Sequence, residues 1–245
     1  VYGKNGFLGS SLNEEKYCFL EGKADITNTQ EVKSELKTID FDYILNLAAV
    51  IDYSNENIKK VLDTNFSANI NILDVTNKPV IGIGSISSLE YKNNPYAFSK
   101  KLMEELVHFY SNFCYIRLPG LFSWKRKSGA VYKFSMQILN NETININNTL
   151  NYWNCLKLES AAELISKNIE LIAQERIVDC GYIEEHNLTK IAYILRKFNK
   201  TYNKEILVVD DSQPFSFNKM NNFFLTPNTT LEKDLKDFFY EICDR

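Results

Sequence analysis

This chain of 245 residues is poor in the residues that build disulfide frameworks and metal centres. It has only two histidines, His108 and His186, so a histidine-built metal site is disfavoured and we predict no metal. The cysteines stand singly, without the CxxC spacing of a zinc or disulfide framework, which is typical of reduced thiols in a cytoplasmic protein. They are Cys18, Cys114, Cys155, Cys180 and Cys243.

Long apolar runs and a strong charge of one sign are also missing. No stretch approaches the ~20 apolar residues that span a bilayer, and no secretory signal precedes the first motif. The net charge is −3 and no basic stripe is present, so neither a membrane nor a nucleic acid is an expected partner. The short cluster Lys125-Arg126-Lys127 is interpreted as a solvated loop, with a phosphate-binding patch as the alternative.

The first informative pattern is the glycine-rich turn Gly3-Lys4-Asn5-Gly6-Phe7-Leu8-Gly9. Val1-Tyr2 is typical of the end of a strand, so the chain begins inside that strand and we expect natural residues before it. Phe7, Leu8 and Leu12 fit an amphipathic helix that opens after the turn. Because a helix start presents free N–H groups and a positive dipole end, the expected occupant is a dinucleotide pyrophosphate. A plain structural turn is the alternative.

Short apolar runs alternate with helical patterns through the first half, which is typical of a parallel sheet covered by helices on both faces. The predicted strands are Tyr17–Leu20, Tyr43–Leu47, Val80–Gly84 and Cys114–Leu118. The predicted helices are Gln30–Leu36, Ile58–Val75 and Tyr96–Phe113. Parallel strands need such crossovers, and the right-handed rule then predicts a doubly wound α/β fold of the Rossmann type.

The second half predicts elements that finish this sheet and add a small C-terminal lobe over the carboxyl ends of the strands, where ligands bind. The predicted elements are the helices Ala161–Ile172, His186–Phe198 and Leu231–Ile242 and the strands Ile177–Val178 and Ile206–Val209. We therefore expect one compact chain with two regions. Residues 1–125 form the dinucleotide-binding region, and residues 126–245 complete the sheet and supply the substrate-binding lobe.

A second pattern, Tyr96-Ala97-Phe98-Ser99-Lys100, places a phenol and an ammonium four residues apart on a helix that Pro95 can start. Both side chains then lie on one helix face. A free phenol has a pKa near ~10, and a neighbouring ammonium favours the phenolate and lowers that pKa. The serine-rich strand end Gly84–Ser88 precedes this helix and completes a proton-transfer site. A packing tyrosine beside a surface lysine is the alternative.

These motifs together resemble the extended short-chain dehydrogenase/reductase family, which comprises nucleotide-sugar epimerases, dehydratases and reductases that use NAD or NADP. The resemblance covers residues 1–125 well and the remainder loosely. Each motif alone is common, but seven of them in the family's order are specific. They are Gly3-x-x-Gly6-x-x-Gly9, Asp25-Ile26, Asn46-Leu47-Ala48-Ala49, Asn65, Gly84-Ser85-Ile86-Ser87-Ser88, Tyr96-x-x-x-Lys100 and Arg117-Leu118-Pro119-Gly120-Leu121-Phe122.

The resemblance implies a catalytic set of Ser87, Tyr96 and Lys100. In this set Ser87 would polarise the substrate carbonyl and Tyr96 would be the general acid. Lys100 would lower the pKa of the phenol and hold the nicotinamide ribose. Ser88 is the second choice for the role of the serine, and Ser85 is a further candidate close by.

The resemblance also implies contacts to a bound NAD or NADP. The loop N–H groups of Phe7 and Leu8 would meet the pyrophosphate, Asp25-Ile26 the adenine, and Pro119 with Leu121 the nicotinamide. The expected cofactor-binding residues are Gly3, Gly6, Phe7, Leu8, Gly9, Glu21, Asp25, Ile26, Leu47, Ala48, Ala49, Asn65, Tyr96, Lys100, Pro119 and Leu121.

The choice between the two cofactors depends on charges near the glycine turn. Lys4 and Lys23 would attract the 2′-phosphate of NADP, whereas Glu21 would repel it and accept a hydrogen bond from the ribose of NAD. Reductive sugar enzymes often use NADP. We therefore favour NADP, with Glu21 as the contrary observation.

The residues around the catalytic set favour a reductase. Dehydratases of the family carry an Asp-Glu pair where this chain has Ser88-Leu89-Glu90, and enolate-forming epimerases use a cysteine and a histidine that are absent between Ser87 and Tyr96. The remaining Ser/Tyr/Lys set suffices for hydride transfer and protonation of the resulting oxyanion. The short step from Ser87 to Tyr96 is similar to compact nucleotide-sugar 4-keto reductases, such as paratose and abequose synthases and dTDP-4-dehydrorhamnose reductase. The resemblance thus implies a reductase of a nucleotide-linked 4-keto-6-deoxysugar.

The chain departs from the family at Asn151–Leu158, where the arginine that usually clamps the nucleotide is absent. Tyr152 or Trp153 is a candidate to stack on the base, although a core aromatic is the favoured interpretation. Lys125 and Arg126 are candidates to meet the diphosphate. The nucleotide carrier is therefore open.

Two other functions stay open. One is a nucleotide-sugar epimerase that retains its NAD, and the other is a non-catalytic dinucleotide-binding regulator. The intact set of Ser87, Tyr96 and Lys100 argues against the regulator. In the family, the helices predicted at Ile58–Val75 and Tyr96–Phe113 pack against their symmetry mates, so a homodimer is expected.

Overall fold

A five-stranded parallel sheet runs through the part of the chain that the computed structural model describes, residues 1–220 and 222–244. Every neighbouring pair in it is parallel, as the sequence predicted. In order across the sheet, the strands are β1 (Ile44–Asn46), β2 (Val80–Ile83), β3 (Phe113–Arg117), β7 (Ile177–Cys180) and β9 (Phe223–Leu225).

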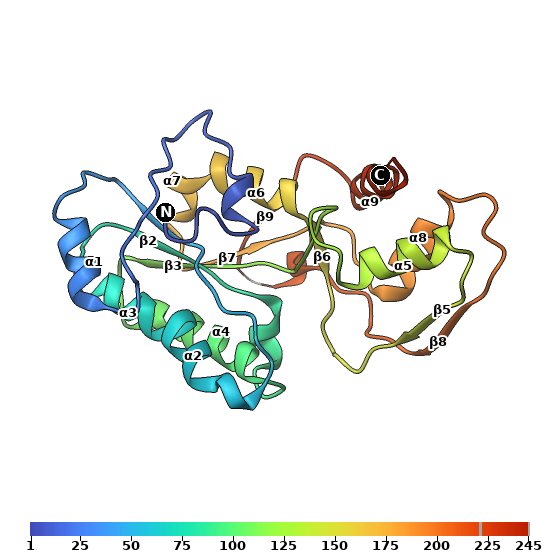
Figure 1. Cartoon of the computed structure of the whole chain (residues 1–245), viewed down its shortest axis with the longest axis horizontal. Coiled ribbons are helices and arrows are strands. Elements are labelled where there is room, and N and C mark those ends of the chain that lie inside the picture. The colour runs from blue at the N-terminus through green and yellow to red at the C-terminus, as the bar shows by residue number, and fades with distance from the viewer. Residues whose placement is uncertain (221, 245) are drawn as a thin grey trace.

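Helices cover both faces of this sheet (Figure 1). On the lower face in Figure 1 lie α1 (Thr29–Leu36), α2 (Ile58–Leu62), α3 (Ala68–Leu73) and α4 (Pro95–Glu105). On the upper face lie α6 (Leu158–Lys167) and α7 (Ile169–Ile172). All residues of the central strand β3 are buried, as expected for a strand with helices on both sides. The predicted α/β architecture is confirmed.

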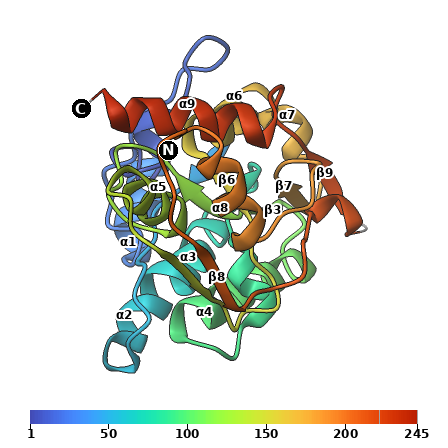
Figure 2. The same cartoon turned by 90° about the vertical axis from the view of Figure 1, so that its right-hand side faces the viewer.

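The chain after β3 builds a smaller lobe at the right-hand end of Figure 1, which faces the viewer in Figure 2. In this lobe β4 pairs with β6 and β5 with β8, both in parallel, while α5 packs on α8. Its described elements are β4 (Gly120–Phe122), α5 (Ala130–Leu139), β5 (Ile144–Asn147), β6 (Cys155–Lys157), α8 (Leu188–Arg196), β8 (Ile206–Asp210) and α9 (Leu231–Cys243).

Two clusters of buried apolar side chains hold these layers together. The smaller lies between the sheet and the lower helices and includes Val32, Ile72 and Met103. The larger lies on the other face and continues into the lobe, where Phe122 packs edge-on against Phe238 with 5.3 Å between the ring centroids. The sheet and the lobe therefore share one continuous interior. The division at residue 125 stays a prediction.

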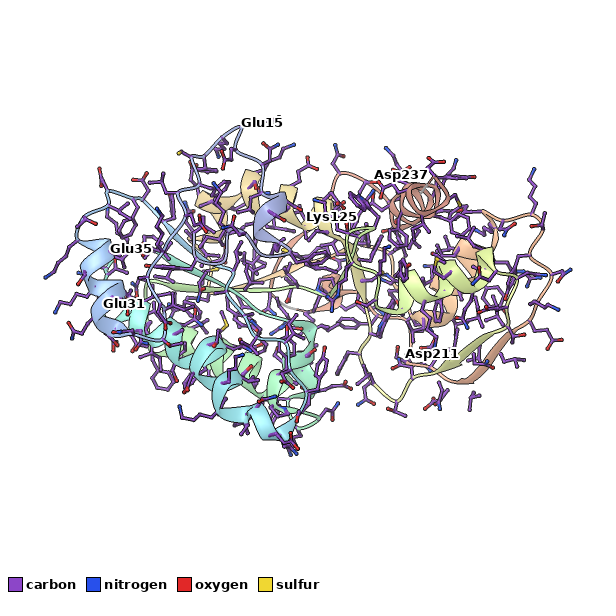
Figure 3. The ribbon with its side chains drawn as sticks, viewed as in Figure 1. Glu15, Glu31, Glu35, Lys125, Asp211 and Asp237 are labelled. Atoms are coloured by element: carbon purple, nitrogen blue, oxygen red, sulfur yellow. The ribbon has the colours of Figure 1, made fainter. Side chains whose placement is uncertain are left out.

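Charged side chains lie around the outside, and Glu15, Glu31 and Asp237 point away from the layers in Figure 3. In residues 1–220 and 222–244 no helix is long and apolar enough to cross a membrane. The same residues contain no group of three or more histidines, cysteines or carboxylates that could hold a metal ion. All cysteines in this part are free, and two of them, Cys18 and Cys243, are exposed.

Two predictions at the N-terminal end are wrong. Tyr17–Leu20 is not a strand, because the expected neighbouring strand contributes only Tyr2, which forms an isolated bridge with Asn46. The helix expected after the glycine turn is only the 3-10 turn Gly9–Ser11, and Leu12 is already extended. With one short turn in place of a helix, the helix-dipole argument for pyrophosphate binding no longer holds. Only the N–H groups of the loop support it.

Other elements differ at their boundaries. The helix predicted over Tyr96–Phe113 ends at His108, because a 3-10 turn follows α4 and Phe113 already begins β3. The helix predicted over Ile58–Val75 is continuous from α2 to α3 but contains a π-helical segment, Asp63–Ser67. The sequence did not indicate α5 or the strands β4, β5, β6 and β9.

Candidate active site

A cleft of about 520 Å³ opens at the carboxyl ends of β1, β2 and β3. The glycine turn and the segments that follow these three strands form its walls, because parallel strands end at the same edge of the sheet. The structure therefore brings together most of the residues predicted for the site. Those that line the cleft are Gly3, Gly6, Phe7, Leu8, Leu47, Ala48, Ala49, Ser87, Tyr96, Lys100, Pro119 and Leu121.

The glycine turn lies tightly against the loop after β1. Gly3 has φ +76°, and a Cβ added there would come within 2.7 Å of the Ala48 amide nitrogen. At Gly9, a Cβ would overlap the carbonyl oxygen of Lys4. Side chains are thus excluded at both positions, which leaves backbone facing the cleft at Gly3 and closes the turn on itself at Gly9. Gly9 does not line the cleft, so its contribution is to the shape of the turn.

Tyr96 and Lys100 lie in the first two turns of α4. Asn94 caps this helix by accepting a hydrogen bond from the Ala97 amide at 2.8 Å, and Pro95 occupies its first turn. The Lys100 Nζ lies 5.7 Å from the centroid of the Tyr96 ring and donates to the Ile83 carbonyl at 2.6 Å. The predicted pairing on one helix face is present.

Burial controls the protonation of both groups. It raises the pKa of Tyr96 to about 12, opposed in part by a hydrogen bond with Ser85. It lowers the pKa of Lys100, which is 3% exposed, to about 8. The expected lowering of the Tyr96 pKa by Lys100 is therefore wrong for the protein alone. The ammonium is directed to the Ile83 carbonyl, and desolvation of the phenolate outweighs its influence.

The three serines after β2 point to different places. Ser85 caps the short 3-10 helix Ile86–Glu90 by accepting from the Ser87 amide, and its Oγ lies 3.2 Å from the Ser87 Oγ. Both line the cleft, and Ser85 is the one bonded to Tyr96. Ser88, the second choice from the sequence, instead donates to Glu104 at 2.7 Å in a buried position. Ser88 therefore serves the packing behind the cleft and not the cleft itself.

A buried ion cluster lies behind the catalytic helix. Arg117 on β3 contacts Glu104 of α4 and Asp179 of β7, each at 2.9 Å, and all three side chains are less than a tenth exposed. Burial acts to raise the pKa of Glu104, but the guanidinium beside it and the Ser88 hydroxyl bring that pKa below its ordinary value. The cluster ties α4, the serine segment and two central strands together.

Asn65 was predicted as a cofactor contact, and the structure places it behind the cleft wall. Its Oδ1 accepts from the Val50 amide at 2.8 Å, and its Nδ2 donates to the Val50 carbonyl at 2.9 Å and to the Ser99 Oγ at 3.0 Å. It thus links the loop after β1 to α4. Its position lies in the π-helical segment, a feature that often marks functional sites.

Besides Gly9 and Asn65, three predicted cofactor residues lie outside the cleft. The carboxylate of Glu21 accepts from the Asn5 side chain, Asp25 accepts from the amide and hydroxyl of Thr27, and Ile26 is buried in the smaller core. Lys4, expected to attract a 2′-phosphate, pairs with Glu14 at 2.7 Å and donates to the Phe19 carbonyl. One observation that favoured NADP is therefore removed.

No sequence motif indicated several of the residues that line the cleft. Tyr53 meets Tyr96 edge-on with 5.8 Å between centroids, and Ile51 and Thr64 line the same wall. Arg126, one of the candidates for the diphosphate, also lines the cleft, and its guanidinium lies 5.7 Å from the Phe7 ring centroid. Tyr53 and Thr64 lie in irregular or helical segments without a recognisable motif, so only the fold identifies them.

A second hollow of about 270 Å³ adjoins the cleft and shares Tyr53, Ile86, Ser87 and Gly120 with it. Its other walls come from the serine segment, the start of α4 and the loop before β6. They are Glu90, Asn93, Asn94, Ala97, Leu150, Tyr152, Trp153 and Asn154.

The two aromatic candidates for base stacking differ in their packing. Trp153 packs against the larger core and meets His186 edge-on at 6.2 Å, whereas Tyr152 is 40% exposed and meets Phe215 at 5.2 Å. Trp153 is thus held from behind, while the ring of Tyr152 has a free side.

Comparison with known proteins identifies the family of this chain. A model of the NAD dependent epimerase/dehydratase family matches residues 1–157, which contain the glycine turn, the serine segment and the Tyr96–Lys100 pair. The chain belongs to that family. The resemblance to extended short-chain dehydrogenases/reductases drawn from the motifs is confirmed.

A plant epimerase is among the relatives of this family member. UDP-glucuronate 4-epimerase 4 of Arabidopsis thaliana is 25% identical over 181 residues, which is 60% of this chain and 41% of the plant protein. The chain thus spans about two fifths of the length of that relative.

Solved structures share the fold over nearly the whole chain. A dTDP-4-dehydrorhamnose reductase of Bacillus anthracis, in complex with NADP, superposes with a TM-score of 0.75 at 17% identity and covers 98% of this chain and 96% of its own. A UDP-N-acetylglucosamine 4-epimerase of Bacillus cereus gives 0.72 at 16% identity, with 98% and 97% covered.

Proposed function

We propose that this family member is an NAD(P)H-dependent reductase of a nucleotide-linked 4-keto-6-deoxysugar. The observation that carries the proposal is the single cleft in which the glycine turn faces Tyr96, the buried Lys100 and two serines. Gly3, where a Cβ would clash with the backbone of Ala48, keeps the turn tight against the loop after β1 and leaves bare backbone at the cleft, which fits the close backbone approach that a dinucleotide needs. When bound, the reduced nicotinamide supplies the hydride.

The protonated phenol of Tyr96 is compatible with ketone reduction. A phenol with a pKa of about 12 keeps its proton at neutral pH and is ready to donate it to an alkoxide. An epimerase must first remove a proton from a substrate hydroxyl, which needs the phenolate instead. The two reactions thus start from opposite protonation states of Tyr96, and cofactor consumption distinguishes them.

Lys100 follows Tyr96 by one helical turn and would assist its proton transfer. With a pKa of about 8 it is mostly an ammonium at neutral pH, so it can hold ribose hydroxyls and stabilise negative charge on the phenol oxygen after proton transfer. The Ile83 carbonyl fixes its position before any ligand binds.

The geometry adds a second candidate for the serine that polarises the substrate carbonyl. Ser87 remains a candidate because it lines both the cleft and the adjoining hollow. Ser85 is bonded to Tyr96 and to Ser87, so we propose that it shares the task of holding the substrate oxygen. Ser85→Ala and Ser87→Ala, measured separately, rank the two; a loss of about 10²-fold in turnover is expected for the donor that stabilises the oxyanion.

The adjoining hollow is the proposed place for the sugar nucleotide. A sugar bound there would lie beside Ser87, which the hollow shares with the cleft that contains Tyr96. The free side of Tyr152 is available for a base, and Arg126 in the cleft for a diphosphate. NADP and NAD both stay candidates, and homodimerisation through α2, α3 and α4 remains part of the proposal. A monomeric mass by light scattering at micromolar concentration would contradict the dimer.

Cofactor consumption tests the function directly. The wild type is mixed with NADH or NADPH and a panel of CDP-, dTDP-, GDP- and UDP-linked 4-keto-6-deoxysugars, and absorbance of the reduced nicotinamide is followed. A reductase consumes it stoichiometrically. The names of the relatives support the second candidate, an epimerase, which would interconvert UDP-sugars with only catalytic NAD.

Gly6→Val tests the cofactor site independently of the substrate. The added side chain would crowd the cleft wall, where even a Cβ comes within 3.1 Å of the Gly3 carbonyl oxygen, so calorimetry should show NAD(P)H binding by the wild type and none by the variant. If neither cofactor binds the wild type, the proposed function fails.

A further inference from the structure

The two adjoining spaces at the candidate active site have walls of opposite charge. In the part of the chain that the structure describes, the charged residues that line the cleft are the cations Lys100 and Arg126. The one that lines the hollow of about 270 Å³ is the carboxylate Glu90, and the other polar groups in that wall are uncharged. A ligand that bridges the two spaces therefore meets cations on one side and an anion on the other.

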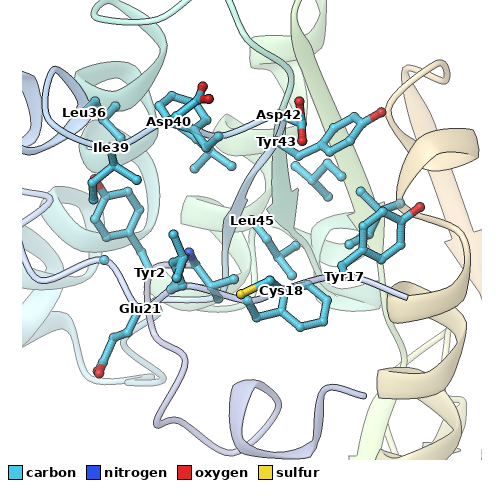
Figure 4. A pocket seen from close by; sticks show the side chains of 18 of the residues that line it. Tyr2, Tyr17, Cys18, Glu21, Leu36, Ile39, Asp40, Asp42, Tyr43 and Leu45 are labelled. Atoms are coloured by element: carbon cyan, nitrogen blue, oxygen red, sulfur yellow. Dashed lines mark hydrogen bonds between the residues drawn. The ribbon is translucent and has the colours of Figure 1, made fainter. Parts of the chain in front are cut away.

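A third cavity, of about 280 Å³, lies apart from these two spaces (Figure 4). Figure 4 shows Tyr2 and Leu36 on one side of it and Tyr17 and Tyr43 on the other. This cavity shares no lining residue with the cleft or the hollow. A ligand that bridges the cleft and the hollow therefore does not reach it.

Glu90 joins two walls of the hollow. It is the last residue of the 3-10 helix Ile86–Glu90, which also carries Ser87. Its Oε1 accepts a hydrogen bond from the Asn151 amide in the loop before β6, and its Oε2 lies 3.5 Å from the Asn93 side-chain nitrogen, which donates to it. Because both oxygens have partners in the wall, the carboxylate is held at the hollow.

The charge of Glu90 has no cation beside it. None of the ion pairs among residues 1–220 and 222–244 includes Glu90, and its two hydrogen-bond donors are neutral amides. Glu104 behind the cleft differs, because it pairs with both Arg117 and Lys101. A neutral donor holds a carboxylate in place but leaves its negative charge uncompensated. The wall of the hollow therefore repels anions.

We infer that Glu90 is a specificity-determining residue that restricts the hollow to sugars without a negative charge. This inference rests on the proposed binding of the sugar in the hollow. At about 270 Å³, the hollow is smaller than the ~300–1,000 Å³ of pockets that hold drug-sized ligands, so a sugar ring in it lies close to every wall. A uronic acid carries a carboxylate at C6 and would bring two like charges together. A 6-deoxysugar or a neutral hexose would not.

The cations of the cleft complement this selection. The pyrophosphate of a dinucleotide and the diphosphate of a sugar nucleotide are anions, which Lys100 and Arg126 attract and Glu90 repels. The charge pattern thus fits a ligand whose diphosphate is anionic and whose sugar is neutral. An unpaired charge that meets the wrong ligand is a common way to obtain specificity.

The size of the effect follows from the distance and the solvent. Two like charges about 6 Å apart near a protein surface repel by an amount that corresponds to about 10–100-fold in affinity. Dissolved salt screens such a repulsion, whereas it does not screen a difference in shape or packing. A preference that depends on charge should therefore weaken at high salt.

The test measures the binding of two matched pairs of sugar nucleotides to the full chain. Calorimetry gives the dissociation constants of UDP-glucose and UDP-glucuronate, and of dTDP-glucose and dTDP-glucuronate, with and without NADP. The members of a pair differ only in the hydroxymethyl or carboxylate group at C6. Their ratio therefore separates the charge of the sugar from the affinity for the carrier. None of the four is a 4-keto sugar, so the measurement does not depend on turnover.

Three variants separate the charge of Glu90 from its hydrogen bonds. Wild type should bind the glucuronate at least about 10-fold more weakly than the glucose, and Glu90→Gln, which keeps an oxygen for the Asn151 amide, should bring the ratio within roughly 3-fold of one. Glu90→Asp keeps the charge and should keep most of the preference. Glu56→Gln, an exposed carboxylate outside both spaces, is the matched control and should show the wild-type ratio.

Several results would overturn the inference. Equal affinity of the wild type for the two sugars is one, and an unchanged ratio in Glu90→Gln is another. A preference that stays the same between about 0.05 M and 1 M salt would show that charge is not its cause. If no UDP- or dTDP-sugar binds, the inference also fails. Consumption of reduced nicotinamide with 4-keto sugars decides the reductase function separately from all these results.

Discussion

Lys100 and Arg117 are both buried cations, with 3% and 2% of their surfaces exposed, yet they belong to regions of opposite character. Arg117 lies in the cluster behind α4 and meets two carboxylates at 2.9 Å. Lys100, at the cleft, meets a backbone carbonyl, and its pKa falls to about 8. Full pairing keeps one cation charged and structural. Incomplete pairing leaves Lys100 able to bind a ligand and to gain or lose a proton.

The same contrast separates the neighbouring serines. Ser88 donates a hydrogen bond to Glu104 of the ion cluster, whereas Ser85 and Ser87 line the cleft and Ser85 interacts with Tyr96. One short 3-10 helix therefore joins the rigid region to the reactive one. If this comparison is right, substitutions in the two regions should change different measured quantities.

The largest expected effect is on turnover at the cleft. Tyr96→Phe keeps the ring and removes the donated proton, so turnover with a 4-keto sugar nucleotide should fall by roughly 10²–10⁴-fold. Cofactor affinity and Tm should stay near those of the wild type. Steady-state kinetics and calorimetry measure the two quantities, and wild-type turnover in this variant would remove Tyr96 from the mechanism.

The next effect is on stability at the ion cluster. Arg117→Met would leave Glu104 and Asp179 buried without their cation, which should lower the free energy of unfolding by about 3–5 kcal/mol. Arg196→Met, at an exposed position, is the matched control and should change it little. Urea unfolding followed by circular dichroism measures both. A loss of less than about 1 kcal/mol would mean that the cluster is not the rigid support described above.

A third prediction concerns pH and Lys100. Because its pKa is about 8 when folded and about 10.4 in an unfolded chain, the unfolded state binds more protons between those values. Wild-type stability should therefore rise with pH in this window, relative to Lys100→Met, by about 2–3 kcal/mol from pH 7 to pH 10. Lys101→Met, whose lysine is paired with Glu104 and Glu105, is the control and should show no such relative rise. Parallel slopes for the wild type and Lys100→Met would contradict the buried environment of Lys100.

The smallest expected effect distinguishes the roles of the adjacent residues Ser87 and Ser88. Ser88→Ala should cost about 1.5 kcal/mol of stability, because it removes a buried hydrogen bond to a carboxylate, and should leave the KM for the sugar nucleotide unchanged. Ser87→Ala should do the reverse, with reduced turnover and nearly unchanged Tm. If the two variants behave alike, the boundary between the regions does not lie within this segment.

The sequence predicted the parts of this site that depend on local spacing. The glycine turn, the pair Tyr96 and Lys100 and the central strands follow from patterns a few residues long, and the structure has them. The choice among the serines did not follow, because Ser85, Ser87 and Ser88 are chemically alike and only the 3-10 turn decides their directions. The lowered Tyr96 pKa was also wrong, since desolvation depends on the whole environment and not on one neighbour.

Missed elements have a similar cause. The strands β4, β5, β6 and β9 are three or four residues long, too short for an alternating pattern to be visible. The segment Tyr17–Leu20 has the composition of a strand, but a strand exists only when a partner pairs with it. Three predicted cofactor residues that follow this segment lie outside the cleft, away from the positions predicted for them at a cofactor. They are Glu21, Asp25 and Ile26.

The parallel pairing of β5 with β8 bears on the order in which parts of the molecule fold during synthesis. Ile144 meets Ile206 in this ladder, and β9 at Phe223–Leu225 completes the main sheet from still later in the chain. A ribosome delivers β1, β2, β3 and α4 well before these partners, and contacts between distant segments form slowly. We expect the cleft wall built by the glycine turn and the ends of β1, β2 and β3 to take shape before the ladder of β5 with β8 and the pairing of β9 with β7.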